Sequence, residues 1–175
     1  MAIEVKLFDY SAEVKAGLTE AGIAWLHTWG EEIASQARRN CKMDGDTGVQ
    51  LRGSYACRVD ETAMEASIGT PLESGFWEEF GTGSHAVDKS KSRKGWWVYT
   101  PDSPGPPGYK SNYYVDEAEA KAMAGYIEEK YGHDAVATNG RDPQHTLENA
   151  FKVTVPKAKA DLPQEVNDKL GGGST

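Results

Sequence analysis

The sequence predicts a chain that combines long helices with antiparallel strands, and three observations lead to this fold. Apolar residues recur every three or four positions from Val14 to Ala37, which is the period of a helix. Residues 51–59 and 63–70 read as two strands with a short connection between them, which predicts a β-hairpin. Helical spacing returns at residues 115–131.

The composition is that of one domain, because 38% of the 175 residues are hydrophobic and can fill a single core. The formal net charge of −8 argues against duplex nucleic acid as a partner of the whole chain, since duplex binding needs a broad basic face. No run of about 18 apolar residues is present, so we expect no membrane span. The first residues lack the regions of a signal peptide, so we expect the chain to stay in the cytoplasm where it is made. Cys41 and Cys57 have no metal-ligand spacing and are expected to be free thiols.

The first half of the chain is expected to contain a strand, a long helix and the hairpin. Residues 2–8 alternate in polarity, which predicts a short strand. Ser11 suits the N-cap of a helix that runs to about Asn40. Such a helix is about 40 Å long, so we expect its apolar stripe to pack against a sheet, a partner subunit or both. Residues 43–48, MDGDTG, are a turn-rich break. Residues 72–80 then fit one or two helical turns, with Phe76 and Phe80 expected to anchor this helix in the core and the two glutamates on a solvated face.

The second half is expected to hold one more strand and two helices. Residues 96–99 read as a strand, and residues 101–112 contain four prolines, which exclude regular structure. In the helix over 115–131 an ion pair is expected between Glu117 and Lys121, with Gly132 as the C-cap. One side of this helix is expected to carry its apolar face, formed by Ala118, Ala122, Met123, Tyr126 and Ile127.

The last helix is expected to start near Arg141, with Leu147, Ala150 and Phe151 along its apolar edge. Two prolines later in this segment, at positions 156 and 163, should bend or restart the helix.

The stretch FWEEFGTGSHA, residues 76–86, is the most distinctive part of the sequence, and it admits three kinds of chemistry. A phosphate loop would need its glycines between a strand and a long helix, whereas Gly81 and Gly83 follow a short helical stretch. A small hydrolase would use His85, together with His145 and the adjacent glutamates, although no nucleophile signature is present. A nucleic-acid-binding module would use the basic loop and tryptophans that follow.

Five local motifs then follow one another along the chain. They are a DTG-x-L-R-x-S-type turn with one extra residue (Asp46, Thr47, Gly48, Leu51, Arg52 and Ser54), an IGT strand end (Ile68, Gly69 and Thr70), an EFGTG segment (Glu79, Phe80, Gly81, Thr82 and Gly83), a His-Ala, Arg-Lys and Trp-Val-Tyr series (His85, Ala86, Arg93, Lys94, Trp97, Val98 and Tyr99), and a helix start resembling RPFLRPAF at residues 142–151. In this order they resemble the tail-component family of long-tailed bacteriophages, the head–tail joining and tail-completion neck proteins similar to lambda's minor tail protein Z.

The resemblance covers residues 11–100 and 140–170, and it has local departures. Gly75-Phe76 stands where the family has Tyr-Ala, and Gln144-His145 stands in place of Pro-Phe. The resemblance implies an α+β fold in which the long N-terminal helix and a C-terminal helix pack on a small, mostly antiparallel sheet. It implies a single domain over residues 1–170, with a loop-plus-helix insertion at 101–139 and a disordered tail at 171–175.

The same resemblance implies a structural, non-enzymatic virion protein with no catalytic, cofactor or metal residue. Its copies would form a ring in the neck, with six expected, between portal and connector (adaptor or stopper) proteins and the tail terminator and tail tube. Genome DNA would pass through the lumen without specific binding. Residues expected at subunit or partner interfaces are Glu78, Glu79, His85, Lys89, Lys91, Arg93, Lys94, Trp96 and Trp97, and residues expected to be structural are Thr47, Gly48, Leu51, Arg52, Phe80, Gly81, Thr82 and Gly83.

Two alternatives of function stay open beside the neck ring. A tail terminator that caps the tail tube directly belongs to the same structural class. The different-class alternatives are the small hydrolase and the nucleic-acid-binding module of residues 89–97.

Overall fold

The computed structural model describes residues 9–43, 45–88, 95–100, 113–114 and 116–171, and the fold is α+β. The chain forms two compact units, one from residues 1–71 with 146–175 and the other from 72–145. The expected strand at residues 2–8 lies outside the described residues. No helix in the described part of the chain is long and apolar enough to cross a lipid bilayer.

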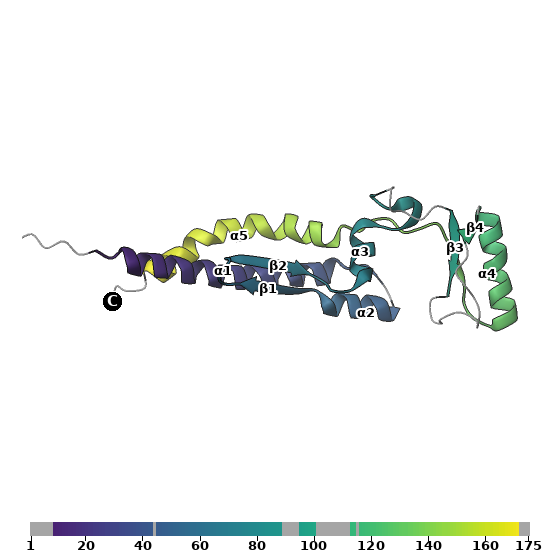
Figure 1. The fold of residues 1–175 in the computed structure, drawn as a ribbon, viewed down its shortest axis with the longest axis horizontal. Helices are drawn as coiled ribbons and strands as arrows, with labels where there is room; N and C mark the ends of the chain where they lie inside the picture. Colours follow the sequence, from purple (N-terminus) through teal and green to yellow (C-terminus); the bar gives the residue numbers. More distant parts are fainter. Residues whose placement is uncertain (1–8, 44, 89–94, 101–112, 115, 172–175) are drawn as a thin grey trace, which may run out of the picture. The chain divides into compact units, whose positions relative to one another are not determined.

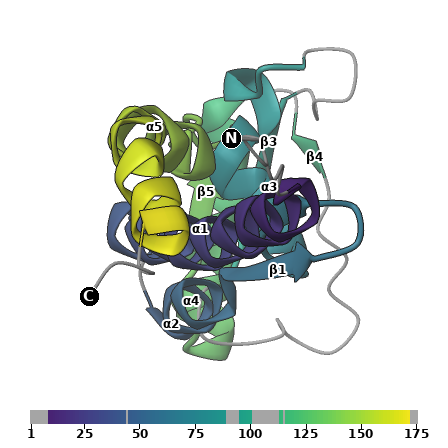
Figure 2. The same ribbon diagram turned by 90° about the vertical axis from the view of Figure 1, so that its left-hand side faces the viewer.

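The first unit is built on two long antiparallel helices that lie side by side, with a hairpin on the other side of the first helix (Figures 1 and 2). Trp25 Nε1 donates to the carbonyl oxygen of Ala158 at 2.8 Å, and Asn40 Nδ2 donates to that of Thr146 at 3.2 Å, so the start of one helix meets the end of the other. The elements of this unit are α1 (Ser11–Asn40), α2 (Gly45–Ser54), β1 (Ala56–Asp60), β2 (Glu65–Gly69) and α5 (Thr146–Gly171).

Glycines on α1 let the hairpin approach the helix closely. A Cβ atom at Gly30 would lie 2.3 Å from Cys57 Sγ, and one at Gly22 would lie 2.6 Å from Met64 Cε. The strands pair antiparallel from Ala56 opposite Gly69 to Asp60 opposite Glu65, as the hairpin prediction requires. Alternate residues of β1 are half-buried, so one face of the hairpin packs on α1 while the other meets solvent.

The prediction of a strand from residue 51 was wrong, because residues 45–54 form helix α2. Gly48 and Leu51, three residues apart, share its buried face, and a Cβ atom at Gly48 would lie 1.9 Å from the carbonyl oxygen of Met43. Arg52 Nη1 donates to that same oxygen at 2.7 Å. The turn-like composition of MDGDTG hid the helix, whose close packing on Met43 depends on glycine at position 48.

Two further expectations about helix ends need correction. Ser11 is the first helical residue and not the cap, and its backbone N–H donates to the Asp9 carboxylate at 2.9 Å, which lowers the pKa of Asp9. The C-terminal helix begins at Thr146 and runs without a restart through Pro156 and Pro163 to Gly171, although its last turns change direction (Figure 1). Within it Ala150 is buried and Phe151 is exposed. The rest of the expected tail, 172–175, lies outside the described residues.

The second unit contains a three-stranded antiparallel sheet with one helix against it. The strand order is β4-β3-β5, and α4 packs on β3 and β5. The segment 101–139 therefore supplies two strands and a helix to the same compact unit as the residues before it, where a loop plus one helix was expected. The elements are α3 (Glu73–Phe80), a 3-10 turn (Gly83–His85), β3 (Trp96–Tyr99), β4 (Tyr113–Tyr114), α4 (Glu117–Tyr131) and β5 (Val136–Thr138).

Helix α4 confirms the predicted ends and corrects the predicted face. Asp116 caps its start, Gly132 ends it at a φ of 67°, and Lys121 Nζ lies 2.6 Å from Glu117 Oε1. Ile127 is buried and Met123 is half-buried against the core, as predicted, whereas Ala118, Ala122 and Tyr126 are exposed. The buried core of the unit consists of Val98, Ala120, Ala124, Ile127 and Ala135.

Candidate interaction surface on helix α3

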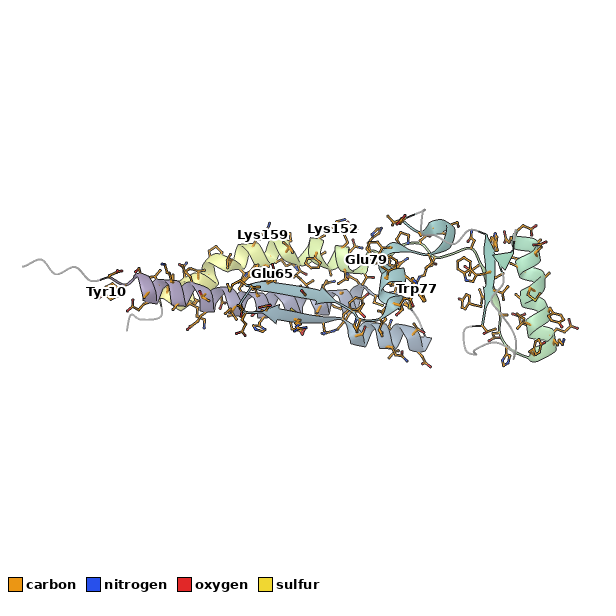
Figure 3. The ribbon with its side chains drawn as sticks, in the orientation of Figure 1. Tyr10, Glu65, Trp77, Glu79, Lys152 and Lys159 are labelled. Atoms are coloured by element: carbon orange, nitrogen blue, oxygen red, sulfur yellow. The ribbon has the colours of Figure 1, made fainter. Side chains whose placement is uncertain are left out.

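Helix α3 is oriented opposite to the expectation from its sequence. Phe76 and Phe80 were expected to anchor it in the core, yet Phe76 is 57% exposed and Phe80 is also exposed. Glu78, expected on a solvated face, is 0% exposed, and Glu79 is buried as well. Trp77 and Glu79 accordingly leave α3 on different sides (Figure 3). The prediction of a helix here was correct, and the prediction of its buried face was wrong.

The buried face of α3 combines small residues with a paired carboxylate. Ser74 and Gly75 are buried and lie one turn before the two glutamates, so the backbone of this face can approach its neighbours closely. Arg141 Nη2 lies 3.1 Å from Glu78 Oε2, and Gln144 donates its backbone N–H to the carbonyl oxygen of Glu78 at 2.8 Å. A buried carboxylate requires such a partner, because an uncompensated charge is strongly unfavourable away from water.

The glycines after α3 fit the chain into a tight turn against residues 139–143. Gly81 has a φ of 72° and Gly83 a φ of 57°, a region that side chains rarely allow. A Cβ atom at Gly81 would lie 2.7 Å from the carbonyl oxygen of Arg141, and one at Gly83 would lie 2.1 Å from that of Asn139. Between them Thr82 accepts the backbone N–H of Arg141 at its hydroxyl and donates its own N–H to the Arg141 carbonyl. At both positions a side chain would meet backbone strain and a close neighbouring carbonyl group, so the turn favours glycine there.

His85 holds the end of this turn to the same segment. Its Nδ1 lies 2.7 Å from Asp142 Oδ1, and its Nε2 lies 3.2 Å from Asn139 Oδ1. Ser84 donates its hydroxyl to the Asn139 carbonyl oxygen at 3.2 Å. A hydrolase base needs its second ring nitrogen to face a nucleophile, whereas this nitrogen faces an amide oxygen. Both ring nitrogens of His85 therefore contact residues 139 and 142, which suits a role in holding the turn to that segment better than proton transfer.

The exposed face of α3 is an apolar cluster. The rings of Phe76 and Phe80 lie with their centroids 4.9 Å apart. Trp77 is exposed on the next position of the helix. Val87, also exposed, is held beside them because its backbone N–H donates to the Phe80 carbonyl oxygen at 2.9 Å. We call these four residues, Phe76, Trp77, Phe80 and Val87, the α3 surface.

The other predicted interface residues divide into two groups. Trp96 is half-buried and packs against the core of the second unit, and Trp97 is half-buried with its ring against Gly83, so both have packing roles within the chain. The four basic residues expected at an interface, Lys89, Lys91, Arg93 and Lys94, lie outside the described residues.

The contacts of Arg141, Asn139 and Asp142 could not be predicted from local sequence pattern, because these residues lie more than 50 positions from their partners along the chain. The sequence did contain one indication of which face of α3 is buried. Ser74 and Gly75 lie four positions before Glu78 and Glu79, so two small residues share a helical face with the two glutamates.

Comparison with known proteins supplies no relative: no family model, no curated protein and no solved structure matches the chain.

Proposed function

We propose that this protein is a structural, non-enzymatic component of the neck of a long-tailed bacteriophage, where its copies form a ring that joins the DNA-filled head to the tail. The observation that carries the proposal is the α3 surface. Three exposed aromatic side chains gather in the FWEEFGTG segment, which also carries the family resemblance, and exposed Val87 follows that segment. Apolar clusters of this kind on a soluble domain are characteristic of protein–protein contact sites.

The proposed partners are portal and connector proteins on the head side and the tail terminator and tail tube on the other. The acidic chain suits a lumen through which DNA passes without sticking, since like charges repel. The alternative within the same class, a terminator that caps the tube directly, differs in position along the neck. The hydrolase receives no support from the surroundings of His85.

The proposal is tested by removing the gene from a phage that encodes this protein. Loss of the protein should leave filled heads and separate tails in electron micrographs, and plasmid-borne wild-type protein should restore joined particles. A Phe76→Ser/Phe80→Ser variant should fail to restore them, whereas Lys121→Ala, a change at an exposed ion pair, should succeed. Normal infectious virions without the protein would contradict a neck role. Density at the end of the tube alone would favour the terminator.

A further inference from the structure

A second exposed apolar surface lies at the start of α1, where the helix extends past both of its neighbours. Leu170 of α5 reaches Gly17, where a Cβ atom would lie 2.8 Å from its Cδ2 atom, and Met64 at the hairpin connection reaches Gly22. Tyr10, where α1 begins (Figure 3), is 62% exposed.

Val14 and Leu18 follow at intervals of four residues and are also exposed, so the three side chains form one stripe. We call Tyr10, Val14 and Leu18 the α1 stripe. Tyr10 and Val14 continue the apolar face of α1 for about two turns beyond Gly17, where Leu170 covers it, and Leu18 lies beside that contact.

A closed ring of identical copies needs two different surfaces on each chain, because a head-to-tail contact joins unlike patches. The α3 surface on one compact unit and the α1 stripe on the other are two unlike apolar surfaces of this kind. Their borders carry opposite charges at Glu73 and Lys15, both exposed, although Glu13 borders the stripe on its other side.

The areas agree with an interface of ordinary size. An aromatic side chain buries about 150–250 Å² when covered, so three that are about half exposed offer on the order of 300 Å². One side of a standard interface buries about 800 Å², a little over half of it apolar. The α3 surface alone would supply most of that apolar share.

We infer that the α3 surface of one copy packs against the α1 stripe of the next copy, and that this contact closes the ring. The inference rests on the proposed neck function, which requires a ring, and it names the surfaces that form it. Phe76, Phe80 and Trp77 would pack against Tyr10, Val14 and Leu18, with Glu73 near Lys15 at the border.

The test uses two double variants of the full chain at exposed positions. Phe76→Ser/Phe80→Ser removes the α3 surface, and Val14→Ser/Leu18→Ser removes the α1 stripe. The matched control is Phe151→Ser/Val153→Ser, an equally exposed aromatic and aliphatic pair on α5. Molar mass is measured by light scattering over a concentration series, and circular dichroism verifies that each variant is folded.

The wild type and the α5 control should form a closed oligomer, and each of the two surface variants alone should be monomeric. A mixture of the two surface variants should form particles with twice the mass of one chain. Each such pair has one intact α3 surface facing one intact α1 stripe, and the other two surfaces are damaged, so growth stops there.

Three results would overturn the inference: a wild type that stays monomeric at its highest soluble concentration, a mixture that stays monomeric, or α1-stripe variants that still assemble. Failure of the proposed neck function can be distinguished from failure of the proposed contact. A ring with these contacts that is absent from virions would refute the neck role alone, whereas a virion protein that assembles through other surfaces would refute this contact alone.

Discussion

At the scale of single residues, the main feature is a buried carboxylate in a helix that exposes its aromatic rings. Glu78 is fully buried and its charge is paired with Arg141, whose side chain is 37% exposed. Because the Arg141 N–H donates to the Thr82 hydroxyl and the Arg141 carbonyl accepts the Thr82 N–H, the pair ties the buried face of α3 to the FGTG turn. The pair therefore lies on the buried face of α3, whereas the rings of Phe76, Trp77 and Phe80 are exposed.

Replacing Arg141 by Ala should destabilise the protein by about 3 kcal/mol, because it removes the Arg141 cation from beside a fully buried carboxylate. Urea unfolding measures the change. The matched control is Arg39→Ala, which breaks a 2.7 Å pair with Glu32 between half-exposed side chains and should change stability by less than about 1 kcal/mol. Equal effects of the two substitutions would contradict a special role for Glu78. Adding Glu78→Gln to Arg141→Ala should recover part of the loss.

The thiol of Cys57 should be alkylated more slowly in the folded protein than in the unfolded chain. Burial, with a further contribution from the Glu31 carboxylate, raises the pKa of Cys57 above its ordinary 9.0. Since the folded state holds the thiol proton more tightly, Cys57 contributes to the free energy of unfolding below pH 9. This contribution is lost as the pH rises through the pKa of Cys57 in the folded state. At pH 8.5 iodoacetamide should alkylate Cys57 more slowly in the native than in the urea-unfolded protein, as read by peptide mass spectrometry.

The Glu31 contribution has its own check. Glu31→Gln should speed the native reaction, whereas Glu32→Gln at the neighbouring position should leave the rate unchanged. A native rate equal to the unfolded rate would contradict the raised pKa.

At the scale of elements, the two long helices and the hairpin are held in register by specific close contacts. Trp25 and Trp29 donate to α5 at Ala158 and Asp161, a few residues before Pro163. Pro163 has no N–H to donate within the helix, and its ring crowds the carbonyl group one turn earlier. The hydrogen bond from Trp25 to the Ala158 carbonyl oxygen lies in that same turn. On the outer side of α5, Lys152 and Lys159 point away from α1 (Figure 3).

Gly30→Ala should destabilise the first unit although alanine favours a helix over glycine by about 1 kcal/mol. The added Cβ atom would lie 2.3 Å from Cys57 Sγ, so the hairpin must shift, which costs about 1–3 kcal/mol. The control is Gly125→Ala on α4, where nothing lies within 4 Å and thermal unfolding should show a gain. Adding Cys57→Ala should relieve the clash. A double variant as unstable as Gly30→Ala alone would show that contact with Cys57 is not the cause of the destabilisation.

At the scale of the whole molecule, the second unit is one continuous segment between the two parts of the first. Its sheet, α4 and the α3–turn–Arg141 contacts all lie within residues 72–145. Its core is small and rich in alanine, so only a few kcal/mol of stability are expected.

The segment 72–145 should therefore fold when produced alone. Its amide cross-peaks in a heteronuclear NMR spectrum should overlay those of the same residues in the full chain. Residues 1–71 joined to 146–175 by a short Gly-Ser linker should keep the helical circular dichroism of α1 and α5. An unfolded 72–145 segment would show that the unit depends on the rest of the chain.

The sequence by itself determined the elements whose signals are local. The period of α1, the hairpin, the strand Trp96–Tyr99 and the glycine cap of α4 follow from spacing and backbone stereochemistry within a few residues. The turn at Gly81 and Gly83 was also readable, because only glycine accepts those dihedral angles without strain.

Only the tertiary structure decided which faces are buried. In α3 both faces have helical spacing, and the face that is buried carries Glu78, whose partner Arg141 lies more than 60 residues away. In α2 the deciding contact is the approach of Gly48 to Met43, and β5 (Val136–Thr138) exists because β3 pairs with it. Local pattern cannot carry such information, since burial is a property of contacts between distant segments.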